Sequence, residues 1–268
     1  TTRKASAVSV LWMVTGPLDV WGASSYIGDR EVSLSRNALL ETCWQFDAIR
    51  ASARGKPWWL AEFTGGRVWS GLGSALRTDA ELQLRVLLAL GFGAEAALFW
   101  QWRPEIFGEE APNFGLTGGG GELTSRTETV SRLANMIARN QALFDALTWK
   151  PAEVGLVWEP RGSIYEQTTG GPRYLYRHAL GLYRALVDSG YPVDFLHARD
   201  LAASGVPASY KVLLVPFQVV DREGLSASLK DWVRRGGALF AGPNYGAYDP
   251  HTYANPRVPP EEIAEVFG

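Results

Sequence analysis

The chain has 268 residues, 46% of them hydrophobic and 20% charged, which is enough for one large or two ordinary domains with a sizeable core. Its 26 Lys and Arg residues against 28 Asp and Glu residues give a net charge of -2, so electrostatics gives no reason to expect nucleic acid or a membrane surface as a partner. One cysteine excludes an intramolecular disulfide, three scattered histidines offer no metal-ligand spacing, and no apolar run reaches the ~18–20 residues of a membrane span.

The first 150 residues alternate apolar extended runs with helical periodicity, which is typical of a parallel sheet whose strands are joined by helices. In chain order, the pattern predicts a strand at 18–26, a helix at 35–54, a strand at 58–63, a helix at 78–91 and a strand at 96–103. Thr78 is a good N-cap for the second helix. Because a helix separates consecutive strands, the strands should run parallel.

A glycine-rich stretch at 117–122 predicts a loop tip, and the apolar spacing of 125–147 predicts one long amphipathic helix that would close a barrel. Three strands are too few for a closed parallel barrel. We therefore interpret residues 1–150 as the last strands of a (β/α)8 TIM barrel, and the chain as a fragment of a longer protein.

A second series of strands and helices follows Pro151. Strands are predicted at 154–158, 193–196, 210–217 and 238–240, and helices at 174–190 and 223–235. The pattern resembles a flavodoxin-like doubly wound α/β domain that covers residues 151–268 and is incomplete. The predicted loop at 159–163 carries one glycine, without a phosphate-binding glycine pattern, so a flavin or nucleotide cofactor is the least favoured reading.

Glu62 is the candidate catalytic residue, because it ends a predicted barrel strand and precedes a Thr-Gly-Gly turn. Barrel enzymes place their active sites at the carboxyl ends of the strands. A carboxylate in an apolar run is costly unless it is paired or hydrogen-bonded, which makes it a functional candidate. The alternative is a structural salt bridge, for instance with Arg67 or Arg103.

The other strand ends carry residue types that suit a sugar ring. Tyr26 ends the first strand, Trp69 lies seven residues beyond Glu62, and Trp102 and Arg103 end the third strand. The following loop carries Glu105, Glu109, Glu110 and Asn113, of which Glu105 and Glu109 are better interpreted as solvated charges. Carboxylates and amides bind hydroxyl groups, and aromatic rings stack on apolar C–H faces. The predicted ligand is therefore a carbohydrate.

Three runs of residues carry a family resemblance. They are Asp19-Val20-Trp21-Gly22, Leu60-Ala61-Glu62-Phe63 and Phe99-Trp100-Gln101-Trp102-Arg103. These runs resemble family 42 of the glycoside hydrolases, the bacterial β-galactosidases. The resemblance implies that Glu62 is the nucleophile, that Trp69 walls the sugar subsite, that Glu110 grips sugar hydroxyls and that Tyr26 is a site tyrosine. Many members have His where this chain has Asn113, which leaves the exact sugar open.

The resemblance also implies a general acid/base Glu that follows an Asn on an earlier strand, and no Asn-Glu dipeptide occurs here. Retaining hydrolysis needs two carboxyl groups about 5–5.5 Å apart. The intact parent is therefore expected to cleave terminal β-D-galactosides or related oligosaccharides, and this chain alone to be inactive. The family's flavodoxin-like domain implies a homo-oligomer, a trimer, and we expect a cytoplasmic protein without metal or cofactor.

Two alternatives stay open. One is a glycosidase of the same barrel clan with another specificity, for arabinosides, glucosides or galacturonides. The other is a non-catalytic sugar-binding or assembly module, whose Trp and Glu residues bind a sugar without cleaving it.

Overall fold

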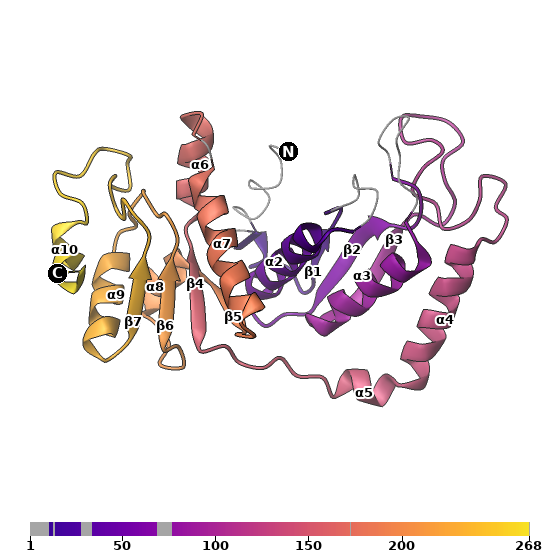
Figure 1. The fold of residues 1–268 in the computed structure, drawn as a ribbon, viewed down its shortest axis with the longest axis horizontal. Helices are drawn as coiled ribbons and strands as arrows, with labels where there is room; N and C mark the ends of the chain where they lie inside the picture. Colours follow the sequence, from indigo (N-terminus) through magenta and orange to yellow (C-terminus); the bar gives the residue numbers. More distant parts are fainter. Residues whose placement is uncertain (1–10, 13, 28–33, 69–76, 172, 268) are drawn as a thin grey trace. The chain divides into compact units, whose positions relative to one another are not determined.

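The computed structural model describes residues 11–12, 14–27, 34–68, 77–171 and 173–267. The chain divides into a first unit, Leu18–Trp149, and a second unit that joins Lys150–Gly268 with Thr1–Pro17. Each unit is an α/β layer with a parallel sheet, coloured indigo to magenta and orange to yellow respectively in Figure 1. Among the described residues, no helix has the length and apolar character needed to cross a membrane.

The first unit contains a three-stranded parallel sheet with strand order β1-β2-β3. Its elements are β1 (Trp21–Ser24), α2 (Arg36–Ala53), β2 (Trp58–Thr64), α3 (Asp79–Gly91), β3 (Ala94–Trp100), α4 (Ser125–Arg139) and α5 (Gln141–Asp145). The predicted alternation of strands and helices is confirmed, and so is the parallel pairing. Two boundaries differ, since β1 covers only part of 18–26 and β3 ends before Trp102 and Arg103.

Local capping explains why α2 and α3 begin where they do. The Ser35 side chain accepts a hydrogen bond from the backbone N–H of Ala38 at the start of α2. At α3, Thr78 and Glu81 form a capping box, in which each side chain accepts a bond from the other residue's backbone N–H. Such caps satisfy backbone donors that have no partner inside the helix. Both helix starts match the sequence prediction.

The single long helix predicted for 125–147 is wrong. Helix α4 ends at Arg139, and a separate short helix, α5, follows Asn140. The Asn140 backbone has φ -115° and ψ 26°, and its side-chain amide donates to the carbonyl oxygen of Met136 at 2.8 Å. Asn competes with the helical backbone for such bonds. The apolar periodicity continued past this break and could not reveal it.

The two faces of the first sheet are covered differently. Helices α2 and α3 pack on one face, where the ring of Trp58 lies 5.5 Å from that of Phe46 in α2 (Figure 1). Side chains alternate between faces along a strand. Trp59, Leu98 and Trp100 lie on the other face with exposed fractions of 38%, 43% and 37%. This open face therefore presents large apolar side chains beside the end of β2.

The second unit contains a four-stranded parallel sheet with strand order β5-β4-β6-β7. Its strands are β4 (Val154–Trp158), β5 (Val193–His197), β6 (Val212–Val215) and β7 (Ala238–Ala241). Its helices are α6 (Pro160–Thr168), α7 (Tyr174–Asp188), α8 (Ala198–Ser204), α9 (Leu225–Arg234) and α10 (Glu261–Phe267). All four predicted strands and the two predicted helices, α7 and α9, are confirmed.

One prediction for the second unit is wrong, and three helices, α6, α8 and α10, were not predicted. Residues 159–163 are the N-cap and first turn of α6 and not a loop, because the Glu159 carboxylate accepts the backbone N–H of Arg161 and Pro160 occupies the first turn. The short helices α8 and α10 were missed. Helix α8 starts directly after β5, with the ring of His197 as its cap, and this residue is not a usual N-cap.

The core of the second unit is built around β4, whose five residues are all buried. Val157 packs with Leu213 and Val215 of β6 and with Trp232 of α9. A Cβ atom at Gly155 would lie 2.5 Å from Leu196 and 2.6 Å from Leu213, so glycine allows the neighbouring strands' side chains to meet over β4. A strand covered on both faces is typical of parallel sheets.

His197 makes the stability of the second unit sensitive to pH. Its ring is 4% exposed and lies 5.5 Å from the ring of Trp12. Burial lowers the pKa of His197 to about 4, although the charges of Glu159 and Asp200 oppose the shift. The unfolded chain takes up this proton near pH 6.5 and the folded chain only near pH 4. Stability present above pH 6.5 is therefore lost as the pH falls toward 4.

We predict that the free energy of unfolding decreases between pH 6.5 and pH 5, on the way to a loss of about 3 kcal/mol at pH 4. His197→Gln should flatten this dependence, because glutamine does not titrate. The measurement is denaturant unfolding at several pH values above 5, with exposed His251→Gln as the control. An unchanged pH dependence in His197→Gln would contradict the prediction.

Candidate functional site

Strand β2 carries one more residue at Ala61–Glu62 than either neighbouring strand. Leu60 pairs with Ala23 of β1 and Glu62 with the next residue, Ser24. On the other side, Leu60 pairs with Ala97 of β3 and Phe63 pairs with Phe99. The two residues Ala61 and Glu62 therefore lie opposite the single residue Leu98. Such a bulge re-aims the side chains around it. Because paired residues of parallel strands share a face, Glu62 lies with Ser24 on the open face of the sheet.

The loops after β2 and β3 continue the sheet beyond its strand ends. The backbone N–H of Gly65 donates to the carbonyl oxygens of Trp100 at 2.9 Å and Phe114 at 3.1 Å. Gln101 N–H also donates to Phe114 O at 2.9 Å, and Phe114 N–H donates to Arg67 O at 2.7 Å. The long loop after β3 therefore folds back onto the end of β2, next to Glu62.

Glycines make this close approach of the two loops possible. A Cβ atom at Gly66 would lie 2.2 Å from the carbonyl oxygen of Gly115, and one at Gly115 would lie 2.1 Å from Cδ of Pro104. A Cβ atom at Gly65 would lie 2.8 Å from Cγ of Leu116. Glycine is the residue that permits such backbone contacts. The two glycines of the Thr-Gly-Gly turn after Glu62 are thus needed for the close packing of the two loops.

The returning loop carries two of the sequence-predicted site residues. The indole Nε1 of Trp100 donates to Oε2 of Glu110 at 3.0 Å. Asn113 is 7% exposed, and its backbone N–H donates to the carbonyl oxygen of Glu110 at 2.8 Å. The ring of Tyr26 meets that of Phe114 edge-on at 6.0 Å. Tyr26, Glu110 and Asn113 are therefore held by the loop that folds back beside Glu62.

Trp100 is the residue of this site that the sequence interpretation missed. It stood inside the Phe-Trp-Gln-Trp-Arg run, but that run does not show which group its indole would contact. Trp100 ends β3 on the open face, and its bond fixes one oxygen of the Glu110 carboxylate. Among the described residues, the other oxygen, Oε1, has no hydrogen-bond partner, so it can accept a further bond.

Two further predicted residues, Trp102 and Arg103, follow the end of β3. Arg103 Nε donates to the carbonyl oxygen of Gly119 at 3.0 Å. The ring of Trp102 is 62% exposed and lines an open groove with Leu123 and residues of α4. Trp69 lies outside the described residues. Among the described residues, no ion pair joins Glu62 to Arg67 or Arg103.

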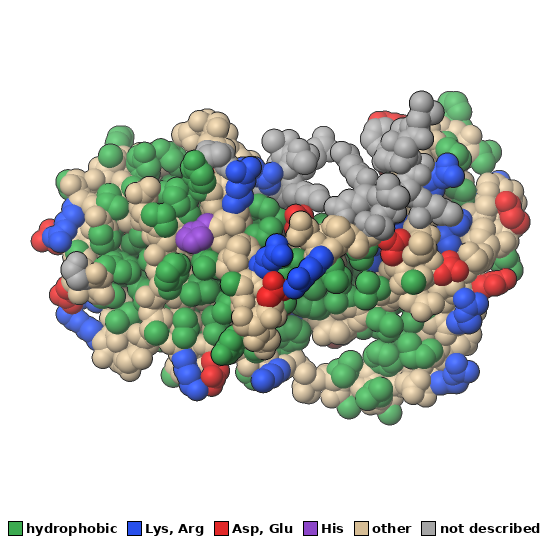
Figure 2. Space-filling view, in the orientation of Figure 1, with side chains coloured by type: hydrophobic (Ala, Val, Ile, Leu, Met, Phe, Trp, Pro, Cys, Tyr) green, Lys and Arg blue, Asp and Glu red, His purple; other side chains and the backbone are tan. Residues whose placement is uncertain are grey.

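The residues that the structure describes contain no group of three or more His, Cys, Asp or Glu side chains that could hold a metal ion. On the face shown in Figure 2, Lys and Arg side chains are interspersed with Asp and Glu side chains, and hydrophobic side chains lie between them. The predicted site residues Glu62, Glu110 and Asn113, with Trp100, carry carboxylate, amide and aromatic groups.

Two family models match the chain. Residues 10–139 match the glycoside hydrolase family 42 model, described as β-galactosidase. Residues 152–268 match a model described as the β-galactosidase trimerisation domain. Together they cover both units of the structure.

Curated relatives match over most of this chain. A β-galactosidase of Haloferax lucentense is 25% identical over 222 residues, which are 82% of this chain and 32% of that protein. A β-galactosidase of Bifidobacterium bifidum is 25% identical over 235 residues, which are 85% of this chain and 33% of that protein. The chain thus spans about a third of the length of the curated relatives it matches.

Solved structures share the fold. The cold-adapted β-galactosidase of Rahnella sp. R3 superposes with a TM-score of 0.79 at 22% identity and covers 96% of this chain and 38% of its own. The β-galactosidase of Bacillus circulans sp. alkalophilus gives a TM-score of 0.83 at 17% identity, with 96% and 37% covered. These likenesses confirm the predicted α/β class with parallel sheets.

The glycine contacts lead to a paired prediction. Gly66→Ala should destabilise the first unit by about 1–3 kcal/mol, because its Cβ would collide with backbone and force the two loops apart. Gly119→Ala, where nothing lies within 4 Å of the added Cβ, should be nearly neutral. Denaturant unfolding measures both variants. Equal stabilities would show that the two loops do not need the glycine contact.

Proposed function

Because the chain belongs to glycoside hydrolase family 42, we propose that it is part of a retaining β-galactosidase in which Glu62 is the nucleophile. The extra residue in β2 supports this proposal, because it directs Glu62 to the open face at the carboxyl end of a parallel strand. Catalytic residues of (β/α)8 barrels occupy this position.

The architecture supports assigning the first unit to a barrel. Residues 1–150 would supply the last strands of the (β/α)8 barrel, and the exposed Trp59, Leu98 and Trp100 would become part of its interior packing. Residues 151–268 would form the flavodoxin-like domain, whose strand order β5-β4-β6-β7 agrees with a doubly wound sheet. The match of this region to a trimerisation domain supports a homotrimer.

The proposed reaction has two steps. The Glu62 carboxylate attacks the anomeric carbon of a terminal β-galactoside and forms a covalent glycosyl ester, while a second carboxyl group protonates the leaving glycosidic oxygen. That second group, now a carboxylate, takes a proton from water, which hydrolyses the ester and releases galactose. We place this second carboxyl group outside residues 1–268, so the chain on its own should not turn over substrate.

Recognition of the sugar is proposed for the residues that surround Glu62. Oε1 of Glu110 would accept a hydrogen bond from a sugar hydroxyl, because Trp100 already occupies Oε2. Tyr26 and Asn113 would line the same site from the loop that holds Glu110. Trp69, Trp102 and Arg103 complete the proposed set.

A second candidate is a family 42 enzyme for another sugar. A family 42 exo-carrageenase of Bacteroides ovatus has the same fold, with a TM-score of 0.60 at 15% identity over 82% of this chain and 29% of its own. Asn113 is buried beside Glu110 and cannot titrate as a histidine would. Relative rates on a panel of aryl glycosides separate this candidate from a β-galactosidase.

We predict that Glu62→Gln in the full-length natural protein lowers kcat on aryl β-galactosides by about 10³-fold or more, because the amide cannot form the glycosyl ester. Glu105→Gln is the matched control, since that loop carboxylate is expected to be solvated, and it should keep close to normal activity. Normal rates in Glu62→Gln would remove Glu62 as the nucleophile. A wild-type protein that binds galactosides without turnover would instead be a binding module.

We also predict that Trp100→Phe lowers kcat/KM by about 10-fold or more, since it keeps an aromatic ring but removes a hydrogen bond to a charged group. Glu110→Gln should lower kcat/KM as well, and the double variant should be less impaired than the sum of the two effects. Steady-state kinetics of all three variants makes the comparison. Strictly additive effects would show that Trp100 does not act through Glu110.

A further inference from the structure

The centre of the second sheet is the place where doubly wound folds bind ligands. Strand β4 has β5 on one side and β6 on the other, so the order of strands reverses at β4. Open α/β sheets bind ligands in the crevice beyond the carboxyl ends of the strands at such a reversal. Glu159 follows β4 directly and Arg222 lies in the segment after β6, so these two residues follow the carboxyl ends of the two strands at this reversal.

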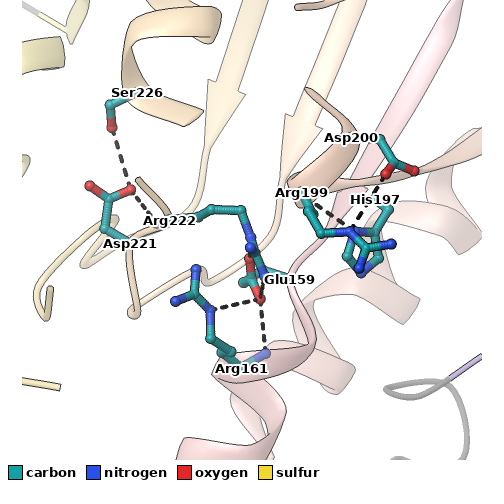
Figure 3. Close-up of polar contacts among 8 residues, drawn as sticks. All are labelled: Glu159, Arg161, His197, Arg199, Asp200, Asp221, Arg222 and Ser226. Carbon is teal, nitrogen blue, oxygen red and sulfur yellow. Dashed lines mark hydrogen bonds and ion pairs between the residues drawn. The ribbon is translucent and has the colours of Figure 1, made fainter. Parts of the chain in front are cut away.

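A buried carboxylate joins these two segments. The Glu159 side chain is fully buried, and Oε1 accepts hydrogen bonds from Arg222 at 3.0 Å and from the backbone N–H of Arg161 at 3.1 Å. Arg222 Nε donates to Oε2, which makes the pair bidentate, and Arg161 Nε lies 3.3 Å from Oε1 (Figure 3). Bidentate arginine contacts are the usual way in which proteins hold an oxyanion.

The first turn of α6 contributes to the same cradle. Glu159 is the N-cap of this nine-residue helix, where free backbone N–H groups and the helix dipole favour an anion. Burial would raise the pKa of Glu159, but the hydrogen bonds and charges of Arg222 and Arg161 outweigh burial and hold it below its usual value. The carboxylate therefore stays ionised where phosphate groups sit in related folds.

A buried histidine, with one ring nitrogen unpartnered among the described residues, lies at the carboxyl end of the neighbouring strand. His197 ends β5, beside β4, and its Nδ1 accepts the backbone N–H of Arg199 at 3.2 Å. Its Nε2 is buried and has no hydrogen-bond partner among the described residues. On the other side, Asp221 accepts the backbone N–H of Arg222 at 2.8 Å and steadies the arginine that grips Glu159. Two arginines and the start of α6 thus hold the Glu159 carboxylate.

We propose that this cradle is an oxyanion-binding site whose ligand is the chain's own Glu159 carboxylate. The native second unit is accordingly closed to external carboxylates and phosphates at this edge. The non-hydrogen atoms that Glu159→Ala removes are those of acetate, so free acetate is the ligand that the opened site should take.

The test is chemical rescue of Glu159→Ala in the full-length natural protein, read by hydrogen exchange of the peptide that contains α6. Without a counter-ion for Arg161 and Arg222, exchange of this peptide should become at least tenfold faster than in the wild type. Acetate should restore protection with a saturable dose dependence, whereas chloride at the same ionic strength and neutral acetamide should not. Rescue by inorganic phosphate but not by acetate would contradict the proposal that the opened site takes an anion with the size and shape of acetate.

Three controls distinguish specific binding of acetate at the Glu159 site from general effects of the anion. Glu159→Gln fills the site without a charge, so its α6 peptide should exchange faster and acetate should not restore it. Glu153→Ala removes an exposed carboxylate that pairs with Lys211, and acetate should leave its exchange unchanged. Wild-type α6 should not respond to acetate or phosphate. Protection of the wild type by either anion would contradict the closed site, and this arm holds even if Glu159→Ala does not fold.

Discussion

The site depends on one extra residue in one strand. In a regular β2, the alternation that buries Leu60 against the helices would turn Glu62 toward them and Phe63 toward the open face. The additional residue at Ala61–Glu62 reverses this arrangement. Glu62 pairs with Ser24 on the open face, while Phe63 is fully buried with its ring 4.4 Å from that of Phe99. A buried core and an accessible carboxylate thus coexist within adjacent residues.

The loops beyond the strands place further candidate binding residues next to Glu62. Phe114 is tied by backbone hydrogen bonds to the ends of both β2 and β3, and the loop that it belongs to carries Glu110. Side chains larger than hydrogen at Gly66 or Gly115 would push this loop away from β2. The carboxylate that is proposed to bind sugar hydroxyls is therefore placed by main-chain contacts, and Trp100 then sets its orientation.

Much of this arrangement could be predicted from local patterns, because the decisive signals were local. Ser35 and Thr78 marked two helix starts, and apolar runs marked the strands. The helix break at Asn140 and the start of α6 at Glu159 could not be predicted from the sequence pattern. Each depends on a hydrogen bond between one side chain and a particular backbone group. The pairs Trp100–Glu110 and Glu159–Arg222 join residues from different segments, and no single-sequence pattern encodes such contacts.

The role of Glu62 can be tested by identifying the residue that becomes covalently attached to the sugar. The full-length natural protein would be treated with a 2-fluoro-galactosyl inactivator, and the labelled peptide would be located by mass spectrometry. We predict a label on Glu62, because only the nucleophile of a retaining enzyme forms the trapped ester. A label on another carboxylate, or turnover of β-galactosides without any label on Glu62, would contradict it.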